Sequence, residues 1–174
     1  MASGGVIVTP VGYFKKCHEV CKKHDVLFIA DEVVTAFGRL GHYFASEAVF
    51  GVVPDMITTA KGLTSGYVPM GALFISDRLI DEIKSASNEA RGFVSGFTYS
   101  GHPVAGAAAM ANLDIFEKDK LLEHVRAISP YFEERIRSLQ DIEIVTDVRV
   151  MGLMAGVECE LDRNNPDEVR DAQF

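Results

Sequence analysis

The residue of this sequence with the clearest chemical potential is a lysine at the end of an apolar segment. Residues 56–60 read Met-Ile-Thr-Thr-Ala, and Lys61 follows them directly, before a glycine-rich turn over residues 62–66. An ammonium group at the end of a buried strand loses hydration, so the position needs either a chemical use or a path to solvent. The chemical use is covalent, because an amine shielded from water can form a Schiff base with a carbonyl compound. The alternative is a lysine whose stem packs on the protein while its amine reaches solvent.

A carboxylate follows a second apolar segment, 30 residues before the lysine. Residues 26–30 read Val-Leu-Phe-Ile-Ala, and Asp31 and Glu32 come next. An apolar run without alternation predicts a strand buried on both faces of a parallel sheet. Ligands of open α/β sheets lie beyond the carboxyl ends of the strands, so Asp31 and Lys61 are expected to face one site. The pair suits a pyridoxal cofactor, which needs an amine for its carbonyl carbon and a carboxylate for its ring nitrogen.

Other interpretations of these residues exist. An apolar strand followed by Asp31 and Glu32 also resembles the magnesium-holding strand of a P-loop ATPase, but the pattern G-x-x-x-x-G-K-[ST] does not occur. Glu32 itself is interpreted as a surface acid or as one that supports its neighbours. Cys17 and Cys21 lie one helical turn apart near two histidines. Small cysteines on a helix face are far commoner than metal sites, so no metal site is predicted.

The composition bounds the class of function. The chain has 174 residues, enough for a hydrophobic core, and 24% of them are charged, as in ordinary globular proteins. The net charge of −8 disfavours a nucleic-acid partner. No apolar run approaches the roughly 18–20 residues that cross a bilayer, so no membrane partner is expected. Unpatterned cysteines and a start without a basic leader favour a reducing compartment, and we predict a cytoplasmic protein.

Strand and helix patterns alternate along the first part of the chain. Strands are expected over 6–8, 26–30, 56–60 and 71–76, and helices over 13–24, 44–50, from residue 77 and over 104–118. This order predicts an α/β fold with a mainly parallel sheet and flanking helices. A helix over 121–139 and strands over 142–145 and 148–159, with kinks at Gly152 and Gly156, then predict an incomplete α+β domain. We therefore divide the chain into domains 1–119 and 120–174.

Three motifs stand in a set order along the chain. They are Asp-Glu-Val-Val-Thr-Ala-Phe-Gly-Arg from residue 31, Pro-Asp at 54–55 with Thr-Ala-Lys-Gly-Leu-Thr-Ser-Gly from 59, and Phe-Thr-Tyr-Ser-Gly-His-Pro from 97. Together with residues 4–8 and 148–154, they resemble class III pyridoxal-phosphate aminotransferases, and more closely the omega-amino acid or amine:pyruvate branch. Each motif alone is weak evidence, whereas their order and spacing are specific. The resemblance implies the large domain of the fold type I transferases, with pyridoxal 5'-phosphate as cofactor.

The resemblance also implies a role for each matching residue. Lys61 corresponds to the lysine that forms the Schiff base and carries the proton between substrate and cofactor carbons. Asp31 corresponds to the partner of the pyridinium nitrogen, and Val33 to the residue packed on one face of the ring. Thr98 corresponds to a hydroxyl that binds the cofactor phosphate, with the backbone of Phe97 beside it. In the family this loop acts across a homodimer interface, so Thr98 would serve the partner subunit's site.

The implied activity is transfer of an amino group from an amine or omega-amino acid to an α-keto acid such as pyruvate. Val34 stands where ornithine- and GABA-type relatives carry a glutamine, which favours the amine:pyruvate branch. Family members are considerably longer, and neither their upstream phosphate-binding loop nor a later carboxylate-binding arginine is found. We therefore expect an internal piece of an aminotransferase that alone binds the cofactor poorly and does not transaminate. It would belong to an active transaminase whose missing parts come from elsewhere. The alternative is a catalytically inactive piece that only folds and oligomerises.

Overall fold

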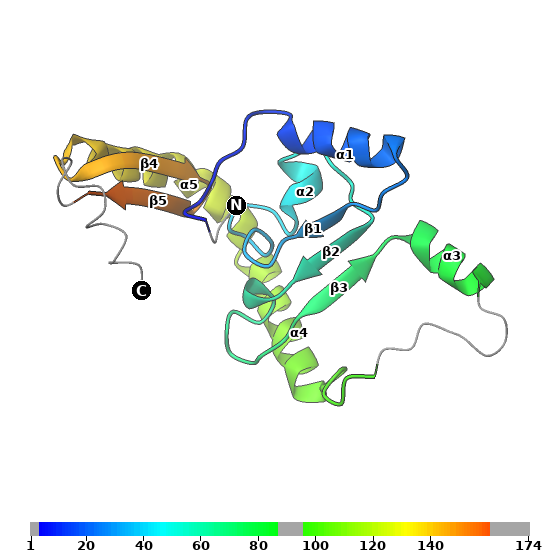
Figure 1. Ribbon diagram of the computed structural model, residues 1–174. Helices are drawn as coiled ribbons and strands as arrows, with labels where there is room; N and C mark the ends of the chain where they lie inside the picture. Colours follow the sequence, from blue (N-terminus) through cyan, green and yellow to red (C-terminus); the bar gives the residue numbers. More distant parts are fainter. Residues whose placement is uncertain (1–3, 87–95, 161–174) are drawn as a thin grey trace.

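The computed structural model describes residues 4–86 and 96–160 of the chain. A three-stranded sheet with its helices forms one part, and a long helix with a two-stranded sheet forms the other (Figure 1). The helices are α1 (Tyr13–Lys23), α2 (Ala45–Ala48), α3 (Asp77–Ala86), α4 (Pro103–Lys118) and α5 (Leu121–Arg137). The strands are β1 (Ile29–Asp31), β2 (Met56–Thr59), β3 (Ala72–Ile75), β4 (Val145–Met151) and β5 (Met154–Cys159), with 3₁₀ turns η1 (Lys61–Leu63) and η2 (Ser138–Asp141). Residues 161–174, the end of the expected C-terminal domain, lie outside the described ranges.

The three-stranded sheet is mixed, with the strand order β1-β2-β3. β1 and β2 run parallel, because the connection between them passes through α2 and returns the chain to the same end of the sheet. β2 and β3 run antiparallel, because the short connection over residues 60–71 contains η1 and no crossover helix. The described sheet thus contains one parallel and one antiparallel pairing, and the alternation of strands and helices is confirmed.

β1 is shorter and more exposed than the apolar run over residues 26–30 predicts. The strand contains only Ile29–Asp31, and the side chains of Val26 and Ile29 are 56% and 54% exposed. Phe28 is half-buried, with its ring centroid 5.4 Å from that of His18 on α1. A strand is buried on both faces only where a layer covers each face, and the described helices leave Val26 and Ile29 uncovered. The prediction of a doubly buried strand is thus wrong.

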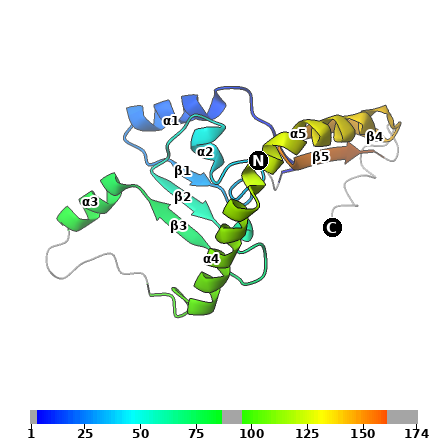
Figure 2. The ribbon, with the colours of Figure 1, turned by 180° about the vertical axis from the view of Figure 1, so that it is seen from behind.

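The hydrophobic core nearest to the sheet joins three segments that are distant in sequence. Its buried residues come from the segment after β1, from η1 and from α4: Ala36, Phe37, Leu63, Ala109 and Phe116. α4 lies beside the end of β2 when the molecule is seen from the front and from behind (Figure 2). Small residues form much of the buried face of α4, which lets its backbone approach the turn that carries Lys61.

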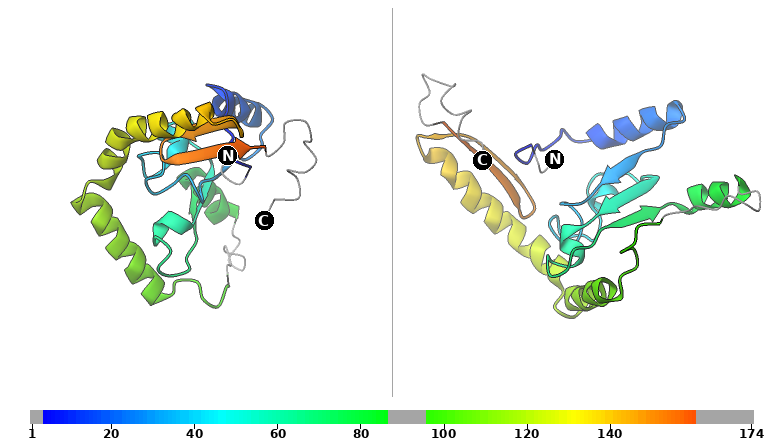
Figure 3. Two further views of the ribbon diagram at one scale, coloured as in Figure 1. Left: turned by 90° about the vertical axis from the view of Figure 1, so that its left-hand side faces the viewer. Right: turned by 60° about the horizontal axis from the view of Figure 1, so that its bottom comes forward.

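β4 and β5 form an antiparallel hairpin that packs along α5 (Figure 3). Three valines of β4 are buried against two side chains of α5, namely Val145, Val148 and Val150 against Phe132 and Ile136. The hairpin turns at Gly152, whose φ of 56° is left-handed and whose Cβ would lie 2.6 Å from the carbonyl oxygen of Arg39. The expected division into strands over 142–145 and 148–159 is therefore wrong. The two strands meet at the turn that contains Gly152, which separates them and does not merely kink one strand.

Residues 6–8 do not form the expected strand, since they join neither of the sheets in the described part of the chain. Val6 has a left-handed φ of 55°, which a strand does not adopt, and its side chain packs with Leu40 and Met154. Arg149 Nε donates to the carbonyl oxygen of Gly5 at 2.9 Å. The first residues thus contact the β4–β5 hairpin, and the division of the chain at residue 119 stays a prediction.

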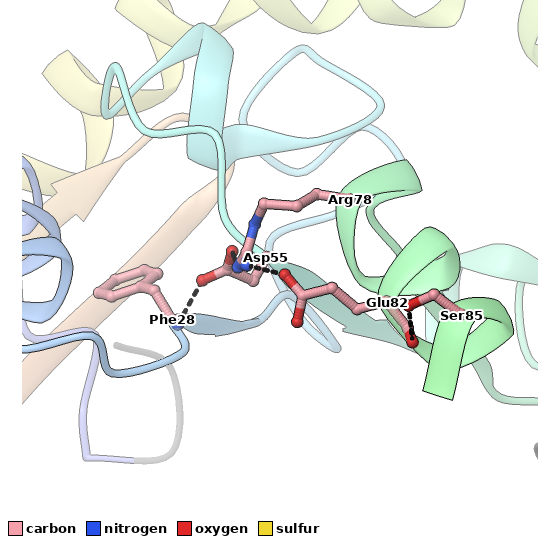
Figure 4. Close-up of polar contacts among 5 residues, drawn as sticks. All are labelled: Phe28, Asp55, Arg78, Glu82 and Ser85. Carbon is pink, nitrogen blue, oxygen red and sulfur yellow. Dashed lines mark hydrogen bonds and ion pairs between the residues drawn. The ribbon is translucent and has the colours of Figure 1, made fainter. Parts of the chain in front are cut away.

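Asp55 joins the starts of β1, β2 and α3 (Figure 4). Its Oδ2 accepts the N–H of Phe28 at 2.8 Å, and its Oδ1 accepts Nη2 of Arg78 at 2.7 Å. Arg78 also donates to Glu82, whose backbone oxygen accepts the hydroxyl of Ser85. The Phe28 N–H, followed by the Arg78 guanidinium, lowers the pKa of the Asp55 carboxyl. The folded state therefore favours the charged form of this residue.

Asp55→Asn tests how much this carboxylate contributes to stability. The variant is expected to lose about 1–2 kcal/mol of unfolding free energy at pH 7, since it removes a charged acceptor of two hydrogen bonds. The folded-state pKa lies below the unfolded value of about 3.9, so the stabilisation is present above that pH and is lost as pH falls through the folded pKa. Urea unfolding at pH 7 and pH 3 should therefore show a smaller difference between the two proteins at pH 3.

The control is Asp81→Asn, which changes an exposed carboxylate of α3 that pairs with Lys84 at 3.8 Å. This exposed pair is expected to contribute little, so its loss should leave the unfolding free energy nearly unchanged. Equal losses in the two variants would contradict the assignment of stability to Asp55.

Candidate active site

A cavity of about 560 Å³ lies where β1 ends, between α1, the start of α2 and the turn after β2. Its volume falls within the roughly 300–1,000 Å³ of small-molecule sites. Three of the predicted site residues line it together: Asp31, Val33 and Lys61. The parallel register explains this arrangement, because Asp31 lies opposite Thr58, and Lys61 follows shortly after the end of β2. The two strand ends therefore deliver an amine and a carboxylate to one space, as expected.

Lys61 has an unusual backbone conformation. Its φ of 36° lies in the left-handed region, which costs a residue with a side chain roughly 1–2 kcal/mol. β2 ends at Thr59, and the chain turns at once into η1, where the N–H of Leu63 donates to the carbonyl of Ala60 at 2.9 Å. This turn takes the chain out of the sheet and leaves Lys61 exposed, so the amine has the path to solvent that the sequence allowed as an alternative to burial. Strained backbone that is held by its surroundings occurs at functional sites, which supports a chemical role for the lysine.

Gly62 lets the turn pack against the segment that follows β1. A Cβ at this position would lie 2.8 Å from the Cβ of Phe37 and 3.3 Å from its carbonyl oxygen. Any larger residue must therefore push the turn away from the core that contains Phe37 and Leu63. The glycine directly after the lysine thus sets how closely Lys61 approaches the cavity wall.

Asp31 ends β1, and its side chain lines the cavity. Oδ1 accepts the N–H of Val33 at 3.0 Å, a local turn that orients the carboxylate. Among the hydrogen bonds within residues 4–86 and 96–160, only the bond to Oδ1 involves the Asp31 carboxylate. None of the ion pairs in these ranges joins Asp31 to Lys61. A carboxylate with one oriented and one open oxygen can accept the N–H of a protonated ring nitrogen. These residues therefore fit a pyridine-type cofactor.

Glu32 is buried, with 3% of its surface exposed, and its carboxylate is surrounded by donors. Oε2 accepts the N–H of Ala45 at 2.6 Å and the hydroxyl of Thr35 at 3.2 Å. Oε1 accepts the N–H of Ser46 at 2.9 Å and a short bond from the hydroxyl of the same residue. N–H groups at a helix start have no partner within the helix, so the carboxylate caps α2.

The structure decides between the two interpretations of Glu32 that the sequence allows. Glu32 is not a surface acid, and its carboxylate supports neighbouring elements. No local spacing indicates this role, because the main donors follow 13 and 14 residues later in the chain. Glu32 is the residue near the cavity whose importance sequence reasoning underestimates.

Phe97 and Thr98 lie away from the cavity of Lys61. They line a separate pocket of about 710 Å³ together with Tyr99, His102 and residues 68–71. The side chain of Phe97 is 82% exposed, and Thr98 is exposed as well. The structure thus brings three of the five predicted residues together and places the other two elsewhere.

Comparison with known proteins decides the family. Residues 1–173 match the family described as Aminotransferase class-III. The chain belongs to this family. It is 44% identical over 174 residues to gamma-aminobutyrate transaminase 1, mitochondrial, from Oryza sativa subsp. indica. This match covers 100% of this chain and 33% of that protein. It is also 44% identical over 157 residues to the putrescine–pyruvate aminotransferase of Pseudomonas aeruginosa. This match covers 90% of this chain and 33% of that protein.

Solved structures agree with the match to the class-III aminotransferases. An omega-transaminase from Pseudomonas jessenii in complex with PMP is 40% identical, with a TM-score of 0.86 over 95% of this chain and 36% of that chain. This likeness confirms the α/β fold of the pyridoxal-phosphate transferases, and the family uses pyridoxal phosphate as its cofactor. The chain spans about a third of the length of the curated relatives that it matches. The branch that Val34 favours stays a prediction, since the similar proteins include both a gamma-aminobutyrate transaminase and a putrescine–pyruvate aminotransferase.

No helix in the described ranges is both long and apolar enough to cross a bilayer. Those residues also contain no group of three or more His, Cys, Asp or Glu side chains that could hold a metal ion, and Cys17 and Cys21 are free thiols.

Glu32→Gln tests whether the buried carboxylate supports this wall of the cavity. The variant is expected to lose about 2–4 kcal/mol of unfolding free energy, because an amide NH₂ then faces the N–H donors at the start of α2. Chemical denaturation followed by circular dichroism measures the loss. Glu47→Gln, an exposed acid on the same helix, is the matched control and should change stability by less than about 0.5 kcal/mol. If both variants match the wild type, the carboxylate does not hold this wall.

Proposed function

We propose that this chain takes part in pyridoxal-phosphate-dependent transamination, with an amine or omega-amino acid as donor and an α-keto acid such as pyruvate as acceptor. The observation that carries the proposal is the single cavity lined by Asp31, Val33 and Lys61 in a chain of the class-III family. The name of the similar putrescine–pyruvate aminotransferase supports both the acceptor and an amine donor. The name of the similar gamma-aminobutyrate transaminase supports an omega-amino acid as donor. We therefore propose the donor only as a class, an amine or an omega-amino acid.

Each cavity residue receives a task that suits its chemistry. The cofactor, when bound, supplies an electron sink beside the substrate carbon. Asp31 would hold a protonated ring nitrogen through the oxygen that the Val33 N–H does not engage. Lys61 would hold the cofactor by condensing its amine with the cofactor's carbonyl carbon, with loss of water. Once the substrate amine has taken its place, the free amine of Lys61 would carry a proton between the substrate and cofactor carbons. The side chain of Val33 would pack against the ring.

We also propose a homodimer in which Thr98 and Phe97 serve the partner subunit's site. The hydroxyl of Thr98 and the backbone N–H of Phe97 are donors that suit the cofactor phosphate. Their exposure, and their separation from the cavity of Lys61, support a role outside their own chain's cavity. A cytoplasmic location stays a prediction, since the similar rice protein is named as mitochondrial.

A second candidate is a chain that folds and associates without catalysis of its own. The observation that favours it is the exposed apolar surface of the sheet, where Ile29 and Leu73 are 54% and 49% exposed. Clustered apolar exposure marks surfaces that other polypeptide covers. This candidate predicts assembly without covalent attachment of the cofactor at Lys61, which separates it from transamination.

Borohydride trapping tests the proposed function directly. The chain is incubated with excess pyridoxal phosphate, reduced with borohydride and mapped by peptide mass spectrometry. The cofactor is in excess because the chain alone is expected to bind it poorly, so the readout is relative. Lys61 is expected to be modified about tenfold above Lys84, a difference that roughly 1.4 kcal/mol of added binding produces. Lys84 is the internal reference, because its side chain is 73% exposed and lies far along the chain in α3. Asp31→Asn should reduce the excess at Lys61, since the ring nitrogen then lacks its charged partner.

Two outcomes of this experiment would count against the proposal. Equal modification of Lys61 and Lys84 would mean that the lysine has no special affinity for the cofactor. An unchanged total yield of the trapped adduct in Lys61→Arg would mean that the attachment occurs at other residues. Either result favours the non-catalytic candidate.

Mixing two variants tests the shared site. Thr98→Ala keeps Lys61 but weakens the phosphate contact, whereas Lys61→Arg keeps Thr98 but removes the amine. In a shared-site dimer, the mixture forms hybrids with one intact site, so trapping at Lys61 should rise above that of Thr98→Ala alone. The size of the chain by sedimentation gives the oligomeric state in parallel. No gain on mixing, in a chain that sediments as a dimer, would place Thr98 outside the partner's site.

A further inference from the structure

We propose that Asn112 of α4 is a positioning residue for Lys61, acting through the backbone of the turn that carries the lysine. The inference rests on the proposed function of Lys61 and adds a residue from a distant part of the chain to that site. Asn112 does not line the cavity, so it is not a catalytic residue. Its contribution is the conformation of the backbone from which the amine extends.

The side chain of Asn112 contacts the turn at three points. Nδ2 donates to the carbonyl oxygens of Gly62 at 2.8 Å and Leu63 at 3.1 Å. Oδ1 accepts the hydroxyl of Ser65 at 2.7 Å. The amide group of one half-buried residue therefore fills both its donor and its acceptor roles within four consecutive residues of the turn.

These contacts fall where the turn needs external support. Lys61 and Ser65 both have left-handed backbones, with φ of 36° and 51°, and they flank the two carbonyls that Asn112 binds. Two of the bonds internal to the turn are long, because the N–H groups of Thr64 and Ser65 lie 3.3 Å from their acceptors, whereas that of Leu63 lies 2.9 Å from the carbonyl of Ala60. A short 3₁₀ turn with such bonds does not hold two strained residues by itself.

Two other segments hold the turn. Gly62 packs directly on Phe37, where a Cβ would lie only 2.8 Å away. Asn112 binds the carbonyls of Gly62 and Leu63 from α4. The packing limits how closely the turn can approach Phe37, and the hydrogen bonds limit how far it can move from α4. The direction in which Lys61 leaves the backbone is therefore set by contacts with two segments that are distant in sequence.

Asn112→Asp is the most informative variant, because it keeps the size and the acceptor for Ser65 but removes the donor to both carbonyls. Ser65→Ala is the matched control, since it removes the third bond and leaves the two carbonyl bonds. Val148→Ala is the control for general loss of stability, because Val148 is buried in the β4–β5 hairpin far from this turn. Asn112→Ala gives the effect without a new charge.

The first readout is hydrogen exchange of the backbone N–H groups of Leu63, Thr64 and Ser65, which needs no cofactor. Asn112→Asp and Asn112→Ala are expected to accelerate this exchange about tenfold, since two hydrogen bonds of ordinary strength are lost. Ser65→Ala should change the exchange of Leu63 and Thr64 less than about twofold, and Val148→Ala should show no acceleration confined to the turn.

The second readout is the trapping ratio of Lys61 to Lys84 with pyridoxal phosphate. It should fall about fivefold or more in both Asn112 variants and stay near the wild-type value in both controls, because a misplaced reacting group loses most of its advantage. Exchange that matches the wild type in the Asn112 variants overturns the inference. Faster exchange with an unchanged trapping ratio also overturns it, because the bonds are then structural without positioning the amine.

Failure of the proposed function is distinguishable from failure of the inference. A wild-type chain with equal trapping at Lys61 and Lys84 refutes the proposed function, and the positioning role falls with it. A wild-type chain that prefers Lys61, together with Asn112 variants that keep this preference, refutes only the role of Asn112.

Discussion

The wall of the cavity depends on the hydrogen bonds that the buried carboxylate of Glu32 accepts. A charge with almost no exposure must be matched by donors, and the residue obtains them from Thr35 and from the first residues of α2. Its backbone N–H also donates to the carbonyl of Thr58 in β2, and its carbonyl accepts the N–H of Ala36. One residue therefore ties the end of β1 to β2 and closes the segment up to α2 into a fixed wall. The two adjacent acids thus have different tasks, since Asp31 faces the cavity while Glu32 holds the structure around it.

The turn after β2 shows how a strained backbone is maintained. The left-handed conformation of Lys61 is unfavourable by itself, and two of the hydrogen bonds inside the turn are long. Packing against Phe37 and hydrogen bonds from Asn112 supply the restraint. The lysine is consequently placed by contacts with residues before and after it in the chain, more than by the strand that precedes it. A site of this kind is sensitive to substitutions that touch neither the cofactor nor the substrate.

The predicted site residues are divided between two pockets, as expected for a chain whose site is completed by another polypeptide chain. Asp31, Val33 and Lys61 share one cavity, whereas Thr98 lies at another, and the sheet leaves apolar side chains exposed. The chain belongs to the class-III aminotransferases and spans about a third of the length of its curated relatives. In the proposed function, its own residues supply a ring-nitrogen partner and a reactive amine, and the phosphate contact comes from the partner subunit.

The sequence by itself determined the family, the presence of Asp31 and Lys61 at one cavity and most helices and strands, because these features are encoded in short motifs and in local hydrophobic periodicity. Only the tertiary structure decided that β3 runs antiparallel, that Lys61 is exposed and that Glu32 is buried. It also decided that Asn112 reaches the turn of Lys61, through a hydrogen bond between residues 50 positions apart. Burial and long-range hydrogen bonds depend on which segments pack together. A local pattern therefore predicts that a strand ends in a charged residue, but not whether that charge meets solvent, a cavity or a set of buried donors.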